Sequence, residues 1–221
     1  MPDDITYIRK WIKRGLSKDG KVLDFSGKGI DHEIAMELAE NVALPDLEIV
    51  YLQNNKLKDT ALEELAAAEF FASVQELWLF DNKIGDAGAA ALAESSRLSR
   101  LKVLSLYTNR IGGEGAAALA NSENLQNLET LDLSFNRIGD AGAVALANSP
   151  HLNRLKVLHL DANGIGAEGM HALANASGLK SLATLNMMYN RIDPAGLEAM
   201  QNSERLRRLP ALKTDWLIAD D

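Results

Sequence analysis

The hydrophobic pattern of the chain repeats every 27 residues. Each copy contains a segment LxLxxN, in which apolar positions alternate, followed by a stretch in which apolar residues recur three and four positions apart. The first segment predicts a short strand with one buried face, and the second predicts a short helix. The clearest copies are LWLFDNKIGDAGAAALA from Leu77, LSLYTNRIGGEGAAALA from Leu104 and LDLSFNRIGDAGAVALA from Leu131. One strand and one helix per copy predict a solenoid whose repeats stack, because a single repeat cannot bury its own apolar faces.

An asparagine closes the strand segment of each repeat. Six of them are spaced 27 residues apart: Asn55, Asn82, Asn109, Asn136, Asn163 and Asn190. Weaker copies at both ends extend the array to seven repeats followed by an eighth strand. An amide side chain both donates and accepts hydrogen bonds, so we expect the column to be a structural ladder that satisfies backbone groups at each turn.

The ends of the helices also carry repeated residues. Asp193 followed by Pro194 predicts an N-cap and a first helical position, and the equivalent helix starts are Gly85, Gly112, Gly139 and Gly166. We expect four asparagines to end helices in the left-handed conformation: Asn121, Asn148, Asn175 and Asn202. Five glycines mark the places where we expect the helix to approach the sheet closely: Gly88, Gly115, Gly142, Gly169 and Gly196.

These motifs resemble a known family. The pattern LxxLxLxxNxI followed by a helix resembles a leucine-rich repeat of the ribonuclease-inhibitor-like subclass, and GAAALA at residues 88–93 and 115–120 resembles the bacterial GALA-type repeats. The resemblance covers residues 20–217. It implies an α/β horseshoe, with a parallel sheet on the concave face, short helices on the convex face, and protein recognition as the usual function.

Both ends of such an array need a cap, since an open end exposes core residues. At the N-terminus the apolar residues follow helical spacing, with four basic residues mostly opposite them. The apolar residues are Ile5, Ile8, Trp11, Ile12 and Leu16. A helix that lies on a membrane surface has the same pattern and is the alternative. At the C-terminus we expect a seal made by Leu209, Leu212, Trp216, Leu217 and Ile218. The predicted division is a capping helix (residues 1–19), a repeat domain (20–208) and a C-terminal cap (209–221).

The residues between the buried leucines face the concave side and are free to vary. Four of the 12 aromatic residues occupy such positions in three consecutive repeats: Tyr51, Trp78, Phe80 and Tyr107. We expect them to form one exposed apolar patch that binds a partner, the alternative being ring stacking that only stabilises the sheet. Phe135 and Tyr189 extend this surface or pack at the turns. The candidate partner-binding residues are Tyr51, Gln53, Glu76, Trp78, Phe80, Tyr107, Asp132, His159 and Asp161.

The charge balance bears on the partner. With 31 acidic and 23 basic residues the chain has a formal net charge of −8, which argues against a nucleic acid. The concave positions carry five acids against Lys213: Asp24, Glu76, Asp132, Asp161 and Asp215. This distribution favours a basic protein partner, and an ordinary solvated acidic face is the alternative.

Little in the sequence points to chemistry. The chain has no Cys, which removes disulfides, thiolate metal sites and a cysteine nucleophile. His159 can meet Asp161 or Asp132, but no nucleophile accompanies it, and the other histidines (His32, His151 and His171) lack ligand spacing. We therefore expect no catalytic residue, cofactor or metal.

The sequence predicts a non-enzymatic protein-interaction module. The N-terminal stretch MPDDITYIRKWIKRGL has no continuous apolar core, so we expect a cytoplasmic protein or one exported without a cleavable signal, and no membrane partner. Two alternatives remain open. One is a GTPase-activating or other regulatory protein on the same fold, as known for one group of ribonuclease-inhibitor-like repeat proteins. The other is a structural or engineered scaffold. Residues that occur in only one repeat argue against this second alternative.

Overall fold

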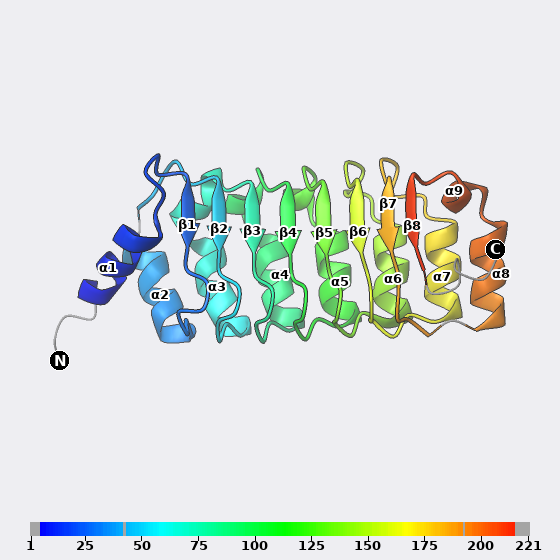
Figure 1. Ribbon diagram of the computed structural model, residues 1–221, viewed down its shortest axis with the longest axis horizontal. Coiled ribbons are helices and arrows are strands. Elements are labelled where there is room, and N and C mark those ends of the chain that lie inside the picture. Colours follow the sequence, from blue (N-terminus) through cyan, green and yellow to red (C-terminus); the bar gives the residue numbers. More distant parts are fainter. Residues whose placement is uncertain (1–4, 42, 192, 215–221) are drawn as a thin grey trace.

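A strand and a helix alternate along the chain, as the repeat predicts. The computed structural model describes residues 5–41, 43–191 and 193–214 (Figure 1). The strands are β1 (Val22–Asp24), β2 (Ile49–Tyr51), β3 (Glu76–Trp78), β4 (Val103–Ser105), β5 (Thr130–Asp132), β6 (Val157–His159), β7 (Thr184–Asn186) and β8 (Ala211–Lys213). The helices are α1 (Ile5–Gly15), α2 (His32–Asn41), α3 (Asp59–Ala67), α4 (Asp86–Glu94), α5 (Gly113–Ala120), α6 (Gly139–Ala147), α7 (Ala167–Ala174), α8 (Pro194–Asn202) and α9 (Glu204–Arg207). Short 3-10 turns, η1 (Glu69–Ser73), η2 (Ser96–Leu98) and η3 (Glu123–Leu125), lead from helices back to the sheet.

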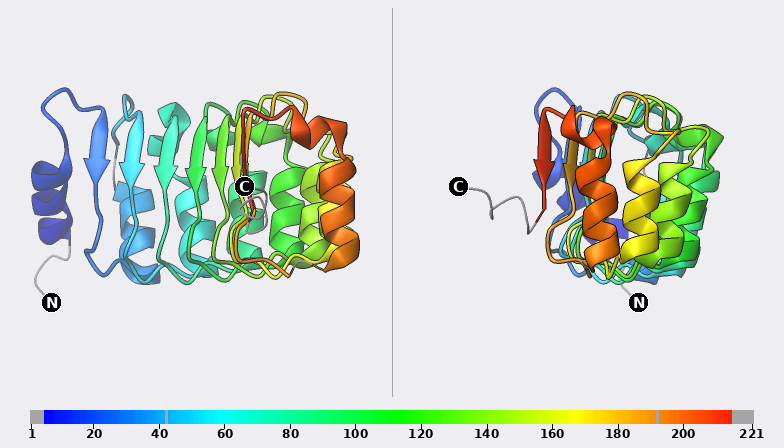
Figure 2. Two further views of the ribbon diagram at one scale, coloured as in Figure 1. Left: turned by 45° about the vertical axis from the view of Figure 1, so that its right-hand side comes forward. Right: turned by 90° about the vertical axis from the view of Figure 1, so that its right-hand side faces the viewer.

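The eight strands form one parallel sheet in sequence order. Each strand residue pairs with the residue 27 positions later, as Leu77 pairs with Leu104. The sheet and helices α2–α8 form two layers along the length of the molecule (Figure 2). The predicted α/β repeat solenoid is confirmed.

The core lies between these layers. In the repeat that begins at Leu77, the side chains of Leu77, Leu79, Ile84 and Leu92 are fully buried. The alternation LxLxxN therefore directs leucines inward and leaves the intervening residues on the outer face of the sheet.

The ladder asparagines join each repeat to the preceding one. Asn136 donates from Nδ2 to the carbonyls of Leu106 (2.9 Å) and Leu133 (3.0 Å), and its Oδ1 accepts from the Ile111 N–H (2.9 Å). In the other five, Oδ1 accepts from Ile30, Leu57, Ile84, Ile138 and Ile165. Four of them also donate to both equivalent carbonyls, whereas Asn163 donates to the carbonyls of Leu133 and Asp161. The amide thus satisfies groups of two repeats at once, which a residue with only a donor or only an acceptor cannot do.

The left-handed residues are not the predicted ones. The helix-ending Asn121 has φ −94° and Asn148 has φ −100°, and their Nδ2 groups donate to the carbonyls four residues earlier. Asn175 does the same with φ −109°, whereas Asn202 lies within α8. Positive φ, between 52° and 60°, occurs instead directly before each ladder asparagine, at Asn54, Asp81, Thr108, Phe135, Ala162 and Tyr189. The prediction of left-handed helix caps is wrong: at Asn121, Asn148 and Asn175 the side-chain amide donates to a carbonyl of the last turn, and the serine hydroxyl of the next repeat donates to a carbonyl at the end of α4 and of α5.

Side chains of adjacent repeats cap the helices. The Asp86 Oδ1 accepts from the N–H groups of Gly112 (2.6 Å) and Gly115 (2.9 Å) at the start of α5. Asp59 and Asp140 cap the next helix in the same way. At the other end, the Ser122 hydroxyl donates to the Ala93 carbonyl (2.5 Å) of the preceding helix. The predicted N-cap at Asp193 is confirmed, because its side chain accepts from the Gly196 N–H (2.8 Å).

The repeated glycines allow close packing, but not against the sheet. A Cβ on Gly88 would lie 2.8 Å from the Asp59 Oδ1 and 2.9 Å from the Ile84 Cγ2. A Cβ on Gly142 would lie 2.9 Å from the Ala116 Cβ in the preceding helix. The close approach is therefore between neighbouring helices and to the isoleucine of the same turn. Gly139, expected as an ordinary helix start, differs from its equivalents and has φ +58°.

Helix α1 packs against the first repeat. Ile8 is buried, Trp11 and Ile12 are partly buried against the core, and the Trp11 ring lies 6.4 Å from the Phe25 ring. At the other end Leu209 and Leu212 are partly buried, whereas Trp216, Leu217 and Ile218 of the expected seal lie outside the described residues, as does the expected concave acid Asp215. In the described part of the chain, none of the helices has the length and apolar character required to cross a membrane.

Candidate functional site

The outward residues of the central strands carry aromatic side chains. Register places Tyr51 of β2 beside Trp78 of β3, with ring centroids 6.2 Å apart. The Trp78 indole N–H donates to the Glu76 Oε2 at 3.3 Å. Both rings are partly buried. We call Tyr51 and Trp78 the strand pair.

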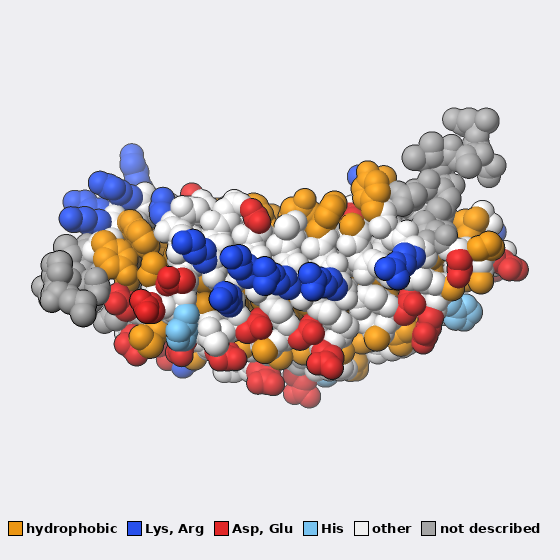
Figure 3. Space-filling model, turned by 90° about the horizontal axis from the view of Figure 1, so that it is seen from below, with side chains coloured by type: hydrophobic (Ala, Val, Ile, Leu, Met, Phe, Trp, Pro, Cys, Tyr) orange, Lys and Arg blue, Asp and Glu red, His pale blue; other side chains and the backbone are white. Residues whose placement is uncertain are grey.

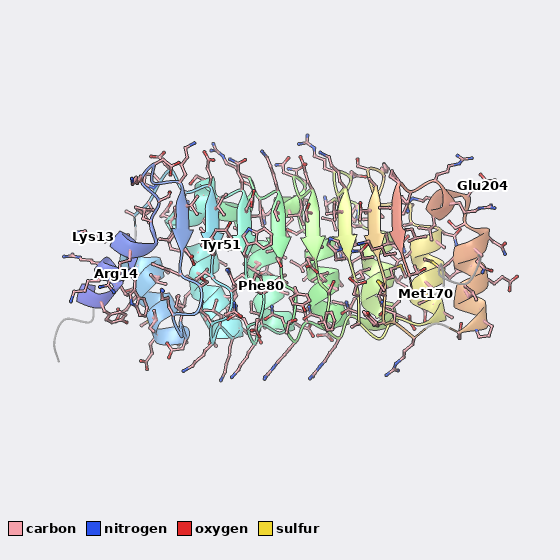
Figure 4. The ribbon with its side chains drawn as sticks, viewed as in Figure 1. Lys13, Arg14, Tyr51, Phe80, Met170 and Glu204 are labelled. Atoms are coloured by element: carbon pink, nitrogen blue, oxygen red, sulfur yellow. The ribbon has the colours of Figure 1, made fainter. Side chains whose placement is uncertain are left out.

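A second aromatic group lies where strands β3–β5 run into their turns. The Phe80 ring is 6.4 Å from the Tyr107 ring, which is 5.2 Å from the Phe135 ring, and both contacts are edge-to-face. Tyr107 and Phe135 keep 37% and 45% of their surface exposed, while Phe80 is partly buried. We call these three residues the aromatic rim. Phe80 lies nearer than Tyr51 to the lower edge of the molecule, where the strands end (Figure 4).

The single aromatic patch expected from the sequence is thus two groups. Ring contacts join residues within the strand pair and within the aromatic rim. Phe135 joins the rim through its left-handed turn, which the alternation of a strand does not predict. Tyr189 is 67% exposed and occupies the equivalent turn two repeats further on.

The acidic residues of this face make hydrogen bonds within the protein. The Asp132 Oδ1 accepts from the Ser134 N–H (2.9 Å), and the Asp161 Oδ1 accepts from the Met188 N–H (2.7 Å). Asp24 binds the N–H and hydroxyl of Ser26. Much of the hydrogen-bonding capacity of these carboxylates is therefore used to fix the turns that follow the strands.

The remaining candidates show no arrangement for catalysis. The His159 Nδ1 lies 2.6 Å from the Asn186 Nδ2 on the next strand, so the histidine pairs with an amide rather than with Asp132 or Asp161. Gln53 is partly buried, and its backbone carbonyl accepts from Gly27 N–H (3.0 Å). Across the ranges that the structure describes, no group of three or more His, Asp or Glu residues is placed to hold a metal ion.

The structure adds a row of cations that sequence reasoning did not single out. The residue after the ladder asparagine is basic in five of six repeats: Lys56, Lys83, Arg110, Arg137 and Arg191. All five are exposed and lie between the end of a strand and the start of a helix. We call this row the basic edge. Its signal in the sequence is the 27-residue period of Lys and Arg.

The opposite edge, at the strand beginnings, is also charged, and two of its cations form ion pairs. Lys21 binds Glu48 (2.5 Å) and Lys156 binds Glu129 (2.7 Å), in each case across adjacent repeats. Hydrogen bonding to these partners raises the pKa of Lys21 and lowers the pKa of Glu129. Lys102 and Arg154 at the same edge donate instead to the neutral side chains of Gln75 and Asn127 (2.7 Å each).

Comparison with known proteins bears on the fold. A search of curated proteins found no match. Among solved structures, an internalin from Listeria monocytogenes superposes with a TM-score of 0.52 at 24% sequence identity, covering 80% of this chain and 49% of the internalin. This chain therefore spans about half the length of that structure, and the likeness concerns the fold. The model of the family described as leucine-rich repeat matches residues 72–93, 99–120, 124–147, 151–174 and 178–200, just over half of the chain. The protein belongs to the leucine-rich repeat family.

Proposed function

We propose that this protein is a non-enzymatic interaction module that binds a protein partner on the sheet face of its solenoid. Membership of the leucine-rich repeat family supports protein interaction in general. The aromatic rim is the observation that supports this location for the binding surface. Its exposed rings stand outside a core already filled by leucines, and the fold does not require them.

Exposed aromatic residues suit a binding surface for a physical reason. A ring buries a large area on association while few rotatable bonds lose freedom, so aromatic residues are frequent anchors in interfaces. The edge-to-face contacts hold Phe80, Tyr107 and Phe135 in place before a partner arrives. The strand pair lies on the adjoining strands and extends the same face.

The acidic residues on the outer face of the sheet predict a basic partner. Asp132 and Asp161 do face outward on the sheet. Their internal hydrogen bonds hold the carboxylates against the turns. The expected basic partner therefore has less support than the aromatic binding surface.

We also propose the finer classification and the division of the chain. A helix in every complete repeat, together with the GAAALA segments, supports the ribonuclease-inhibitor-like subclass and a GALA-type repeat. The buried Ile8 and the Trp11–Phe25 contact support residues 1–19 as an N-terminal cap of the repeat domain 20–208. The partial burial of Leu209 and Leu212 supports a C-terminal cap from residue 209.

Alanine substitution at the aromatic rim tests the proposal. The wild-type protein serves as bait in lysate from its source, and a captured protein is then purified for affinity measurement by calorimetry. Tyr107→Ala and Phe135→Ala should each weaken this affinity by about 2 kcal/mol. Met36→Ala on α2 is the matched control, because Met36 and Tyr107 are both 37% exposed but lie on different layers. Unchanged affinity in both rim variants, or an equal loss in the control, would contradict the proposed surface.

A further inference from the structure

The aromatic rim and the basic edge follow the same side of the molecule. In Figure 3, which views this side, Lys and Arg side chains form a row along the length. Hydrophobic side chains lie on the upper flank of that row, toward the sheet, and most of the acidic side chains lie on the lower flank, toward the helices, among further hydrophobic ones. The cations therefore lie between the sheet side and a helical side that carries most of the acidic side chains visible in this view.

Stacking of the repeats fixes the positions of these cations. The backbone N–H of Arg110 donates to the Ile84 carbonyl of the preceding repeat (2.8 Å), and Lys83 and Arg137 make the equivalent bonds (2.9 and 2.8 Å). Neighbouring parallel strands lie about 4.8 Å apart, so the row has a regular spacing of about this size at its base. It is interrupted at Gly164, where the Arg191 Nε lies 4.0 Å from the place a Cβ would occupy.

The basic edge has no ion pair like those of Lys21 and Lys156 at the opposite edge. In the described part of the chain, ion pairs join Lys21 to Glu48, Arg97 to Glu69, Lys156 to Glu129 and Arg208 to Glu204, and none involves a cation of the basic edge. The nearby carboxylates of Asp59, Asp86 and Asp140 accept hydrogen bonds from the helix starts. The basic edge thus presents exposed cations that form no ion pair with the described carboxylates.

Three consecutive turns present a ring and a cation together. Phe80 precedes Lys83, Tyr107 precedes Arg110, and Phe135 precedes Arg137. A ligand that lies along this side thus meets an apolar row and a basic row in parallel. The three turns span about 10 Å, and an extended peptide of three or four residues covers that length.

We propose that this side of the solenoid binds an extended acidic segment of a protein partner, with its apolar side chains on the aromatic rim and its carboxylates on Lys83, Arg110 and Arg137. The inference rests on the proposed protein-binding function and replaces the basic partner expected from the sequence. Lys and Arg side chains are long and flexible, so they can follow the wider spacing of alternate residues in an extended chain.

The ring geometry favours a peptide over a single-stranded nucleic acid. Proteins that bind single strands stack successive bases on open ring faces. Here the Tyr107 ring makes edge-to-face contacts with both Phe80 and Phe135, which occupy part of the surface that a base would need. The net charge of −8 also disfavours a long polyanion, whereas a short acidic segment meets only the local basic row.

Binding of defined probes tests this inference. The probes are a fluorescein-labelled peptide of about twelve residues with the repeat Asp-Tyr, which places Asp and Tyr on opposite sides of an extended chain, the same peptide with Asn for Asp, and a labelled oligo(dT) of similar length. Fluorescence anisotropy measures their affinity at low and high salt. The acidic peptide should bind the wild-type protein at least about tenfold more tightly than its Asn counterpart, and salt should weaken the binding.

Two triple variants locate the site. Lys83→Glu, Arg110→Glu and Arg137→Glu together should weaken binding of the acidic peptide by about tenfold or more. The matched control combines Arg100→Glu, Lys102→Glu and Arg154→Glu, which make the same change in net charge at the exposed opposite edge and should alter the affinity by less than about threefold. Circular dichroism checks that both variants fold.

The outcomes separate this inference from the proposed function. Equal losses in the two triple variants, no preference for Asp over Asn, or tighter binding of oligo(dT) would overturn the acidic-segment inference. If that happens while Tyr107→Ala still weakens the captured partner, the proposed protein-binding surface stands without it. If the acidic peptide binds as expected and Tyr107→Ala leaves the captured partner unaffected, the inference holds for the peptide and the proposed surface fails.

Discussion

Replacing one ladder asparagine with alanine should destabilise the whole solenoid. Asn136 lies in the middle of the array and is 8% exposed, so water has little access to the groups it binds. Its Oδ1 accepts from the Ile111 N–H, and its Nδ2 donates to the carbonyls of Leu106 and Leu133. Alanine removes all of these bonds.

The size of the loss in unfolding free energy depends on which backbone groups keep another hydrogen-bond partner after the substitution. The Leu106 carbonyl still accepts from Asn109 (3.0 Å), and the Leu133 carbonyl still accepts from Asn163 (2.9 Å). The Ile111 N–H loses the hydrogen bond that the ladder supplies. An unsatisfied buried donor costs about 1 to 3 kcal/mol, and weakened bonding of the carbonyls adds about 1 kcal/mol or less. We expect Asn136→Ala to lower the free energy of unfolding by about 2 to 3 kcal/mol.

Urea unfolding measures this loss, followed by far-UV circular dichroism and by tryptophan fluorescence. Two probes are needed because repeat proteins can unfold in parts. The control is Asn148→Ala, whose exposed side chain donates to the Val144 carbonyl (3.0 Å) at a helix end and should cost about 0.5 kcal/mol or less. If Asn136→Ala were as stable as Asn148→Ala, the ladder would not be holding the repeats together.

Three further substitutions test the packing, capping and turns, with the same urea measurement. Leu79→Ala should lower the free energy of unfolding by about 2 to 5 kcal/mol, because truncation of a fully buried side chain leaves a cavity. A smaller loss would mean that neighbouring side chains move in to fill the cavity. Asp86→Ala should cost about 1 to 2 kcal/mol by uncapping two N–H groups of α5, and no loss would mean that water replaces the carboxylate. Thr108→Gly should be neutral or stabilising by about 1 kcal/mol, since Thr108 has φ +55°, and a clear loss would show that its side chain outweighs the strain.

The sequence by itself determined the strand and helix pattern. The alternation in LxLxxN and the helical spacing after Ile84 are local, and the 27-residue period repeats them, so each copy supports the others. The buried leucines, the parallel register and the N-cap at Asp193 follow from this local information. The positions of outward residues were also predictable, because a strand allows only two directions for its side chains.

Only the tertiary structure decided which side chains meet across repeats. Asp86 caps helix α5, which begins 27 residues later, Phe135 joins the aromatic rim through a left-handed turn, and Asp161 accepts a hydrogen bond from the next turn. These contacts depend on how far each repeat shifts and rotates on its neighbour and on the rotamers that packing selects. No local periodicity encodes those quantities, so the sequence placed the candidate residues on the correct face while the stacking of the repeats grouped them.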